Sequence, residues 1–387
     1  MSLVASNCIM TNLYVTGGRQ KKRILKNEEE WNLYERALIF RLDPATLSCE
    51  TCVDYVTPPG VRPSGETSIL FKGGTLEDGR LYVCTSTEAL VYAVPEFNRV
   101  GYVSLPCFND LHHVSPTREG ALLAVSTGLD MVVEFSPKGV VSREWGVLGT
   151  DPWTRFSKQV DYRLVATTKP HRSHPNFVFQ IDQDIWVTRF VQRDAICLTH
   201  PCQRIEIGVE KPHDGLVRGD KIYFTTVDGH LVIVDKKTLQ VAEVVDLNLI
   251  DNERHALLGW CRGLCVVDEK LVWVGFTRVR KTKFKENINW VKHAFRATEK
   301  PTHIALYDLA ARKRLQEVDL EPYGMNLIFG IFPAEGRNMP PGTAGSRPTS
   351  YRTSDGETEE CESGRFAEQG DYFHEPRPSC ISLSLPH

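Results

Sequence analysis

The sequence lacks the features of a membrane or secreted protein. No segment approaches about 18 uninterrupted apolar residues, so no membrane-spanning helix is expected. Residues 1–13 contain no basic stretch ahead of an apolar run, which argues against a secretory signal. We therefore predict a soluble cytoplasmic protein whose 11 cysteines are mostly buried thiols rather than a disulfide framework.

Strong charge of either sign is also missing. The 387 residues carry a net charge of −3, and 41% are hydrophobic while 25% are charged. Recognition of nucleic acid or of an anionic membrane needs a concentrated basic surface, so we expect neither as a partner. The composition is that of a folded globular chain, which makes a small molecule the expected partner and leaves the oligomeric state open.

Helical periodicity is nearly absent before residue 337. Short apolar runs alternate with turns containing Asp or Gly, which indicates repeated four-stranded antiparallel units. In the clearest unit, residues 213–247, the pairs Gly219-Asp220 and Asp228-Gly229 are typical of tight hairpin turns. Four further units begin at Ser68, Leu111, His174 and Cys261.

A sixth unit requires both ends of the repeated region. The strand expected from Met325 finds partners only if residues 12–18, 37–47 and 49–56 pair with it. At about 43 residues per unit, the sequence predicts an all-β, six-bladed β-propeller over residues 10–336, closed by its N-terminal strands. Five or seven blades are the alternatives. Residues 337–387 are rich in Pro, Gly, Ser, Thr and Glu and are predicted to be a disordered tail.

The segment HDGLVRGDKIYFTT, followed by GHLVIVD, resembles the repeat of NHL-repeat, gluconolactonase-like and strictosidine-synthase-like propellers. The whole chain also resembles uncharacterised bacterial propeller proteins of unknown function. This resemblance implies a fold and no chemistry. A calcium lactonase site, with Glu66, Asn176 and Asp214 as candidates, is disfavoured because the EGP context of gluconolactonase-like proteins is missing.

Three long loops, residues 17–34, 146–173 and 278–301, fall on one face of the predicted ring. Strands alternate in direction, so these loops meet at the face where each inner strand begins. Long loops gathered in this way usually bind ligands or cover a site, and we expect a covered entrance to the central channel there. The last loop is locally basic, and Ile288, Val291 and Phe295 recur at helical spacing, which indicates a short helix.

Histidines occur where several inner strands begin. His112 and His113 precede one inner strand, while His174 and His213 open two others. Inner strands converge on the channel, and convergent neutral imidazoles are suited to Zn²⁺, Fe²⁺ or Cu²⁺. We predict that these four residues hold a divalent transition metal. Adjacent strand residues point to opposite sides, so only one of the neighbouring pair faces the channel, and we favour His113.

Other histidines and another interpretation stay open. His171, His230 and His255 are substitutes on the same face. The peptidyl-hydroxyglycine lyase domain is a resembling six-bladed propeller in which histidines of different blades hold zinc, which implies only that the geometry is feasible. The alternative is that the histidines are structural and hydrogen-bonded between blades.

The catalytic candidates are Arg262, Asp214 and Arg189. The two arginines suit a carboxylate or phosphate, and Asp214 suits the orientation of a metal ligand. We predict a metal-dependent propeller enzyme that acts on a small polar or anionic molecule by hydrolysis, elimination, isomerisation or oxidation. The alternative is a non-catalytic propeller that binds a protein or a glycan.

Overall fold

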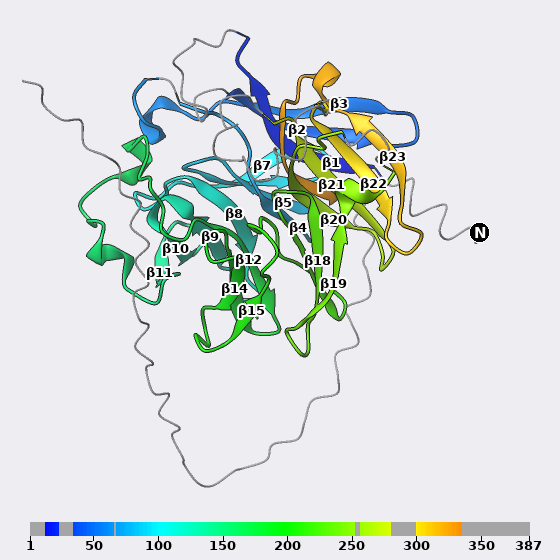
Figure 1. Cartoon of the computed structure of the whole chain (residues 1–387). Coiled ribbons are helices and arrows are strands. Elements are labelled where there is room, and N and C mark those ends of the chain that lie inside the picture. Colours follow the sequence, from blue (N-terminus) through cyan, green and yellow to red (C-terminus); the bar gives the residue numbers. More distant parts are fainter. Residues whose placement is uncertain (1–11, 23–33, 66, 252–255, 280–298, 335–387) are drawn as a thin grey trace, which may run out of the picture. The chain divides into compact units, whose positions relative to one another are not determined.

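In the computed structural model, residues 12–22, 34–65, 67–251, 256–279 and 299–334 are described. They form six four-stranded antiparallel sheets (Figure 1). Each sheet is one blade of a β-propeller, and the strand nearest the central channel is its inner strand. The predicted all-β fold with six blades is confirmed.

Five blades are continuous in sequence. Blade 1 holds β4 (Gly74–Glu77), β5 (Arg80–Cys84), β6 (Ala89–Ala93) and β7 (Asn98–Val103), and blade 2 holds β8 (Leu111–Pro116), β9 (Leu122–Ser126), β10 (Met131–Phe135) and β11 (Val141–Gly146). Blade 3 holds β12 (Pro175–Ile181), β13 (Asp184–Arg189), β14 (Asp194–Cys197) and β15 (Arg204–Glu206). Blade 4 holds β16 (Leu216–Arg218), β17 (Lys221–Thr225), β18 (His230–Asp235) and β19 (Val241–Asp246). Blade 5 holds β20 (Trp260–Val266), β21 (Leu271–Thr277), β22 (His303–Asp308) and β23 (Lys313–Asp319).

Blade 6 joins the two ends of the ring. Its inner strand β24 (Leu327–Pro333) pairs with β1 (Leu13–Gln20), which continues through β2 (Tyr34–Asp43) to β3 (Ser48–Tyr55). The inner strands β4, β8, β12, β16, β20 and β24 contact one another in this order, and β24 contacts β4. The predicted closure of the ring by the N-terminal strands is therefore confirmed.

Turn chemistry and interblade packing explain why these residues adopt this fold. Asp78 and Gly79, between β4 and β5, both have positive φ, as a tight hairpin turn requires. Each pair of neighbouring blades shares a buried apolar core. Trp186 packs with Phe224 between blades 3 and 4, and Trp273 packs with Phe40 between blades 5 and 6. Burial of these faces is the main source of stability.

The helices of the described residues are short 3-10 turns. They are η2 (Pro59–Val61), η3 (Thr127–Leu129), η4 (Pro152–Thr154), η5 (Tyr162–Leu164), η6 (Leu247–Leu249) and η9 (Glu321–Tyr323). The loop expected from residue 17 begins later, because β1 extends to Gln20. The helix expected around Ile288–Phe295 and the tail at 337–387 lie outside the described residues. No helix in the described ranges is long and apolar enough to cross a membrane.

Candidate functional site

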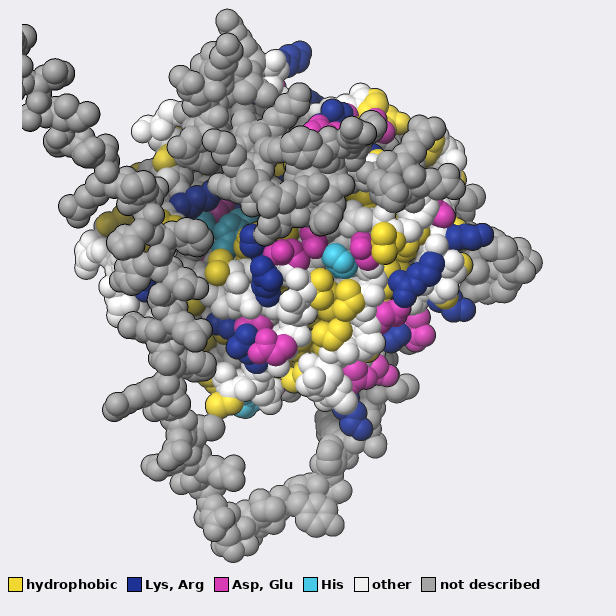
Figure 2. All heavy atoms as spheres, viewed as in Figure 1, with side chains coloured by type: hydrophobic (Ala, Val, Ile, Leu, Met, Phe, Trp, Pro, Cys, Tyr) yellow, Lys and Arg dark blue, Asp and Glu magenta, His cyan; other side chains and the backbone are white. Residues whose placement is uncertain are grey.

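A cavity of about 710 Å³ opens on the face where the inner strands begin. The lining comes from segments that precede or start inner strands, from the start of β2, from the β5–β6 and β13–β14 turns, from the loop between blades 2 and 3, and from the connection between β3 and β4. The loop at 146–173, predicted to cover this face, contributes Val165–Thr167 and Lys169–His171. Figure 2 shows a group of histidine side chains beside lysine or arginine side chains on the visible face.

Four histidines line this cavity: His112, His171, His174 and His213. The ring centroids of His112 and His174 are 4.8 Å apart, and those of His112 and His213 are 6.0 Å apart. Nδ1 of His171 lies 2.9 Å from Nδ1 of His174. The structure therefore brings together three of the predicted residues and one of the substitutes.

His113 faces away from this group. Its Nε2 donates to the carbonyl oxygen of Gly74 at 2.9 Å, and its ring stacks on Phe177 at a centroid distance of 3.6 Å. The pairing of β8 with β9 shifts register between Leu111 and His113, and His112 lines the cavity instead. The preference for His113 as the inward-facing neighbour was wrong, because this irregularity breaks the simple alternation of the strand.

The hydrogen bond of His112 fixes its tautomer. Nδ1 of His112 lies 2.8 Å from the carbonyl oxygen of Asp110, which can only accept, so the proton of the neutral ring is on Nδ1. The lone pair of the ring is then on Nε2. The Asp110 carboxylate makes an ion pair with Lys72, whose side chain is 5% exposed.

Burial keeps the histidine rings neutral. It lowers the pKa of His174 to about 3 and moves the pKa values of His112 and His213 well below the ordinary value. The positive charge of Lys72 acts in the same direction on all three rings. Burial would raise the pKa of Asp110, but the interactions of its carboxylate with the Lys72 ammonium and, after it, with the nearby histidines outweigh burial and lower that pKa.

A buried carboxylate holds the segment that carries His174. Asp130, 3% exposed, accepts hydrogen bonds from the backbone N–H groups of Arg172, Ser173 and His174 at 2.9, 3.0 and 2.9 Å. Arg155 donates to the same carboxylate at 2.7 Å. His174 itself has φ of 56°, an uncommon conformation for a residue with a side chain, and these bonds hold it there.

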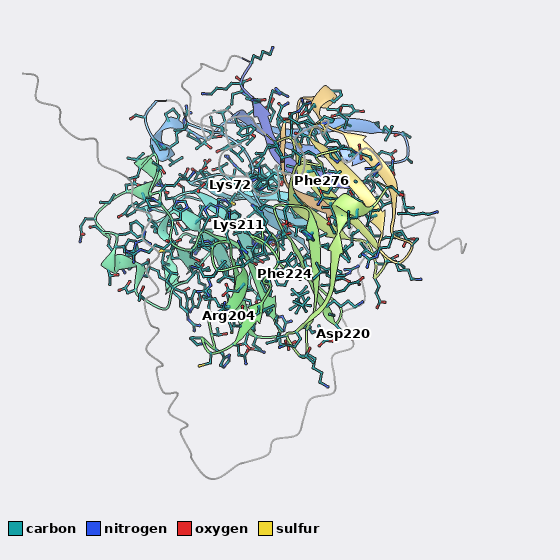
Figure 3. All side chains as sticks on the ribbon, viewed as in Figure 1. Lys72, Arg204, Lys211, Asp220, Phe224 and Phe276 are labelled. Carbon is teal, nitrogen blue, oxygen red and sulfur yellow. The ribbon has the colours of Figure 1, made fainter. Side chains whose placement is uncertain are left out.

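The charged groups of the lining are mostly cationic. Among the described lining residues, the basic side chains are Arg62, Lys72, Lys169, Lys211 and Arg262, and the acidic one is Asp110. The Arg262 guanidinium lies 3.8 Å from the ring centroid of Phe329, and the Lys211 ammonium lies 5.6 Å from that of Phe190. Figure 3 places Lys72 and Lys211 towards the centre of the ribbon, with Arg204 and Asp220 at its lower edge.

Two of the predicted catalytic residues lie outside this lining. Asp214 accepts hydrogen bonds from the Thr225 hydroxyl and, at 3.0 Å, from the Gly263 backbone N–H, and burial raises its pKa to about 6. Arg189 pairs with buried Asp194 at 2.5 Å and donates to a backbone carbonyl at 2.9 Å. Of the three predicted catalytic residues, Arg262 lines the cavity.

The remaining candidates of the sequence analysis occupy other positions. The Asn176 amide donates to the Pro212 carbonyl at 3.0 Å, between blades 3 and 4. Nδ1 of His230 lies 3.0 Å from the Asp228 carboxylate, away from the described lining. Glu66 and His255 lie outside the described residues.

Sequence reasoning missed several lining residues. Lys72 stands in the apolar run SILFKGG, and Asp110 directly precedes the His112-His113 pair. A lysine inside an otherwise apolar segment is a usable signal, since burial of an unpaired ammonium is costly. The connection from Thr57 to Leu70 carries no comparable signal, and its place in the lining becomes visible only in the structure.

Metal ligation needs closer convergence than the cavity histidines have. In the part of the chain that the structure describes, the one group of three His, Cys, Asp or Glu side chains with ligand atoms within 4.8 Å of each other is Asp184, Cys197 and His200. Those residues lie in blade 3 outside the cavity lining. The cavity histidines would have to rotate to place three nitrogens around one ion.

The fold is shared with a solved bacterial protein. A protein of unknown function from Bacteroides caccae superposes with a TM-score of 0.53 at 13% identity, over 84% of this chain and 98% of that one. A nidogen/laminin complex gives a TM-score of 0.49 at 7% identity, over 83% of this chain and 97% of that one. Virginiamycin B lyase from Staphylococcus aureus gives 0.39 at 14% identity, over 61% and 69%. No protein family and no curated protein matches the sequence.

Proposed function

We propose that this propeller is an enzyme that binds a small organic anion in the cavity and moves protons on it with neutral histidines. The observation that carries the proposal is the composition of the cavity lining. Four buried or half-buried histidines share a cavity with five basic side chains and one acidic side chain among the described residues. Such a cavity attracts negative charge and also holds neutral imidazoles, which a bound anion would make more basic by stabilising their protonated form.

The charges favour an anion that carries an apolar body. Asp110 is already paired with Lys72, so the remaining cations of the lining keep a net positive charge. Phe329 and Phe190 each lie against a cationic side chain, Arg262 and Lys211 respectively. A carboxylate or phosphate could contact these cations while an apolar or aromatic group packs on the phenyl rings.

The contact between His171 and His174 supplies a path for a proton. Two neutral rings whose Nδ1 atoms lie 2.9 Å apart must share one proton between these atoms, so one ring donates and the other accepts. A proton gained at one ring can be passed to the other through this contact. His112 adds a separate base, because its proton is held on Nδ1 by the Asp110 carbonyl.

Anion binding is tested by titration calorimetry with benzoate, and with benzylamine as the cation of similar shape. Benzoate should bind and benzylamine should not. Lys211→Met should weaken benzoate binding about tenfold, the effect of losing roughly 1.4 kcal/mol of charged interaction, whereas the exposed Lys313→Met should leave it unchanged. Equal binding of the two probes would refute the proposal.

The proton chemistry is tested by repeating the benzoate titration near neutral pH in buffers of different ionisation enthalpy. A neutral histidine that meets a bound carboxylate should take up a proton, since the anion stabilises the charged ring. His174→Ala should remove a measurable part of this uptake. Benzoate binding without proton uptake would support the non-catalytic binding role instead.

The metal-dependent form is a second candidate for the same cavity. It is favoured by the short distance between Nδ1 of His171 and Nδ1 of His174, because two neutral nitrogens this close can also share a Zn²⁺, Fe²⁺ or Cu²⁺ ion. Such an ion would supply a Lewis acid or lower the pKa of a bound water molecule. It ranks second because the histidines bring no three ligand atoms together among the described residues.

Elemental analysis of purified protein separates the two forms. The metal-dependent form predicts about one equivalent of metal in the wild type and a loss in both His174→Ala and His213→Ala. A wild type without metal removes this form and leaves the anion proposal intact. Metal that is retained in both variants would refute these histidines as ligands.

A further inference from the structure

A second cluster of metal-ligand side chains lies in blade 3, on the face opposite the cavity. Asp184 begins β13, Cys197 ends β14, and His200 follows in the turn that leads to β15. The cavity lies where inner strands begin, and the ends of the first and third strands of a blade lie on the other face. The cluster and the cavity are therefore separate.

The geometry of this cluster is compact. Nδ1 of His200 lies 2.8 Å from Oδ1 of Asp184, and the ligand atoms of all three residues lie within 4.8 Å of one another. The Cys197 side chain is buried, while the His200 side chain is 63% exposed. One side of the cluster is thus anchored in the blade and the other is open to solvent.

The turn brings two groups of His200, its backbone N–H and its imidazole, close to the Cys197 sulfur. The backbone N–H of His200 donates to Sγ of Cys197 at 3.1 Å. The same three-residue spacing places the His200 imidazole beside this sulfur.

We infer that Cys197, His200 and Asp184 form a Zn²⁺ site, with water in the fourth position. Thiolate, imidazole and carboxylate are the ligand types that zinc takes, and three protein ligands with one open position are a known tetrahedral arrangement. On binding, the Cys197 thiol releases its proton to solvent. The Nδ1 proton that His200 now shares with Asp184 moves to Nε2, so Nδ1 can bind the ion.

The alternative is a hydrogen-bonded turn without a metal. The Thr199 hydroxyl also donates to Asp184, at 2.7 Å, so the carboxylate is satisfied within the protein. Zinc binding replaces the His200–Asp184 hydrogen bond with two bonds to the ion. Sγ of Cys197 takes part in the turn too, because it accepts from the His200 N–H and lies 3.2 Å from the Thr199 hydroxyl oxygen. The thiol still decides between the alternatives, because it becomes a strong zinc ligand only as a thiolate.

Cobalt spectroscopy on metal-depleted full-length protein tests the site. Titration with Co²⁺ should give a near-ultraviolet thiolate-to-cobalt band that saturates at about one ion per chain and disappears when Zn²⁺ is added. His200→Ala removes an exposed side chain and Asp184→Asn keeps the size of a half-buried one, so both should fold, and each should reduce the band at the same Co²⁺ concentration at least about tenfold. Cys202→Ser removes an exposed thiol from the same turn and should leave the band unchanged.

The outcomes are distinct. Absence of the band in the wild type, or an equal band in His200→Ala, would overturn the site. Loss of the band in Cys202→Ser would refute this ligand set. Cys197→Ser should also lose the band, and thermal unfolding shows whether that buried variant is folded. Cobalt bound by cavity histidines gives no thiolate band, so the two sites are separable.

Discussion

Removal of the Asp130 carboxylate should release the segment that carries His174. In Asp130→Ala, the backbone N–H groups of Ser173 and His174 lose charged acceptors at 3.0 and 2.9 Å. Ser173 is fully buried, so its N–H finds no water in the native arrangement. At roughly 1.5–3 kcal/mol for a hydrogen bond to a charged group, the bonds to the Ser173 and His174 amides alone should contribute about 3–6 kcal/mol of local stability.

Hydrogen exchange measures this loss directly. A decrease of about 3–6 kcal/mol in the free energy of local opening corresponds to roughly 100-fold to 10,000-fold faster exchange of the Ser173 and His174 amides. Benzoate affinity should fall as well, because His174 no longer holds its left-handed conformation in the cavity. Asp130→Asn keeps one acceptor oxygen and should show an intermediate effect.

Asp161→Asn is the matched control for this experiment. Asp161 lies in the loop at 146–173, and its carboxylate accepts hydrogen bonds from Arg163 at 2.8 and 2.6 Å rather than from the segment that carries His174. Its substitution should leave the exchange of the His174 amide unchanged. If Asp130→Ala exchanged and bound benzoate like the wild type, the carboxylate would not be what positions His174.

The pH dependence of the free energy of unfolding should also change when Asp130 is replaced by Asn. Burial opposes ionisation of Asp130, but the hydrogen bonds from His174 and Arg155 outweigh it and lower the pKa of Asp130. A lowered pKa means that the contribution to stability is present above the unfolded value, about 3.9, and is lost as the pH falls through the folded value. The stability difference between the wild type and Asp130→Asn should therefore shrink below about pH 4 in acid-unfolding curves.

Three further substitutions test other parts of the molecule. The Asp228 carboxylate raises the pKa of His230. The stabilisation from protonated His230 is therefore present below the unfolded pKa of about 6.5 and is lost as the pH rises through the folded pKa. The destabilisation by His230→Ala, measured by urea unfolding, should fall by about 0.5 kcal/mol between pH 6 and 8, and a destabilisation that stays constant would contradict this. A Cβ on Gly17 would lie 1.8 Å from a backbone oxygen of β24, so Gly17→Ala should cost at least about 2 kcal/mol, whereas Gly60→Ala, in open space, should cost little. Trp273→Ala should cost about 3–5 kcal/mol in denaturant unfolding, and a wild-type midpoint would refute its place in the core.

The repeated turns made the fold predictable from the sequence. The same regularity explains why two of the cavity histidines could be predicted. Pairs such as Asp228-Gly229 mark hairpins locally, and the unpaired strand at Met325 required the N-terminal strands as partners. Since every inner strand begins on one face, the positions of His174 and His213 followed from blade boundaries alone.

Side-chain direction was harder to predict, because it depends on register and on partners that are distant in sequence. The irregular pairing near Leu111 turned His112 towards the cavity. Arg189 was assigned to the same face from its blade position, but Asp194, five residues later on the neighbouring strand, holds its guanidinium. A pattern of apolar and polar residues contains neither of these facts.

The closure of the ring also sets the order in which the cavity can be built during synthesis. Leu327 and Phe329, which line the cavity, belong to β24, the last strand of the ring to leave the ribosome. Until that strand emerges, β1 has no partner on its inner side, and the earlier blades surround an incomplete hollow with an exposed sheet edge. A nascent chain that ends before Leu327 would therefore already contain all four cavity histidines but would lack the closed cavity that binds a ligand.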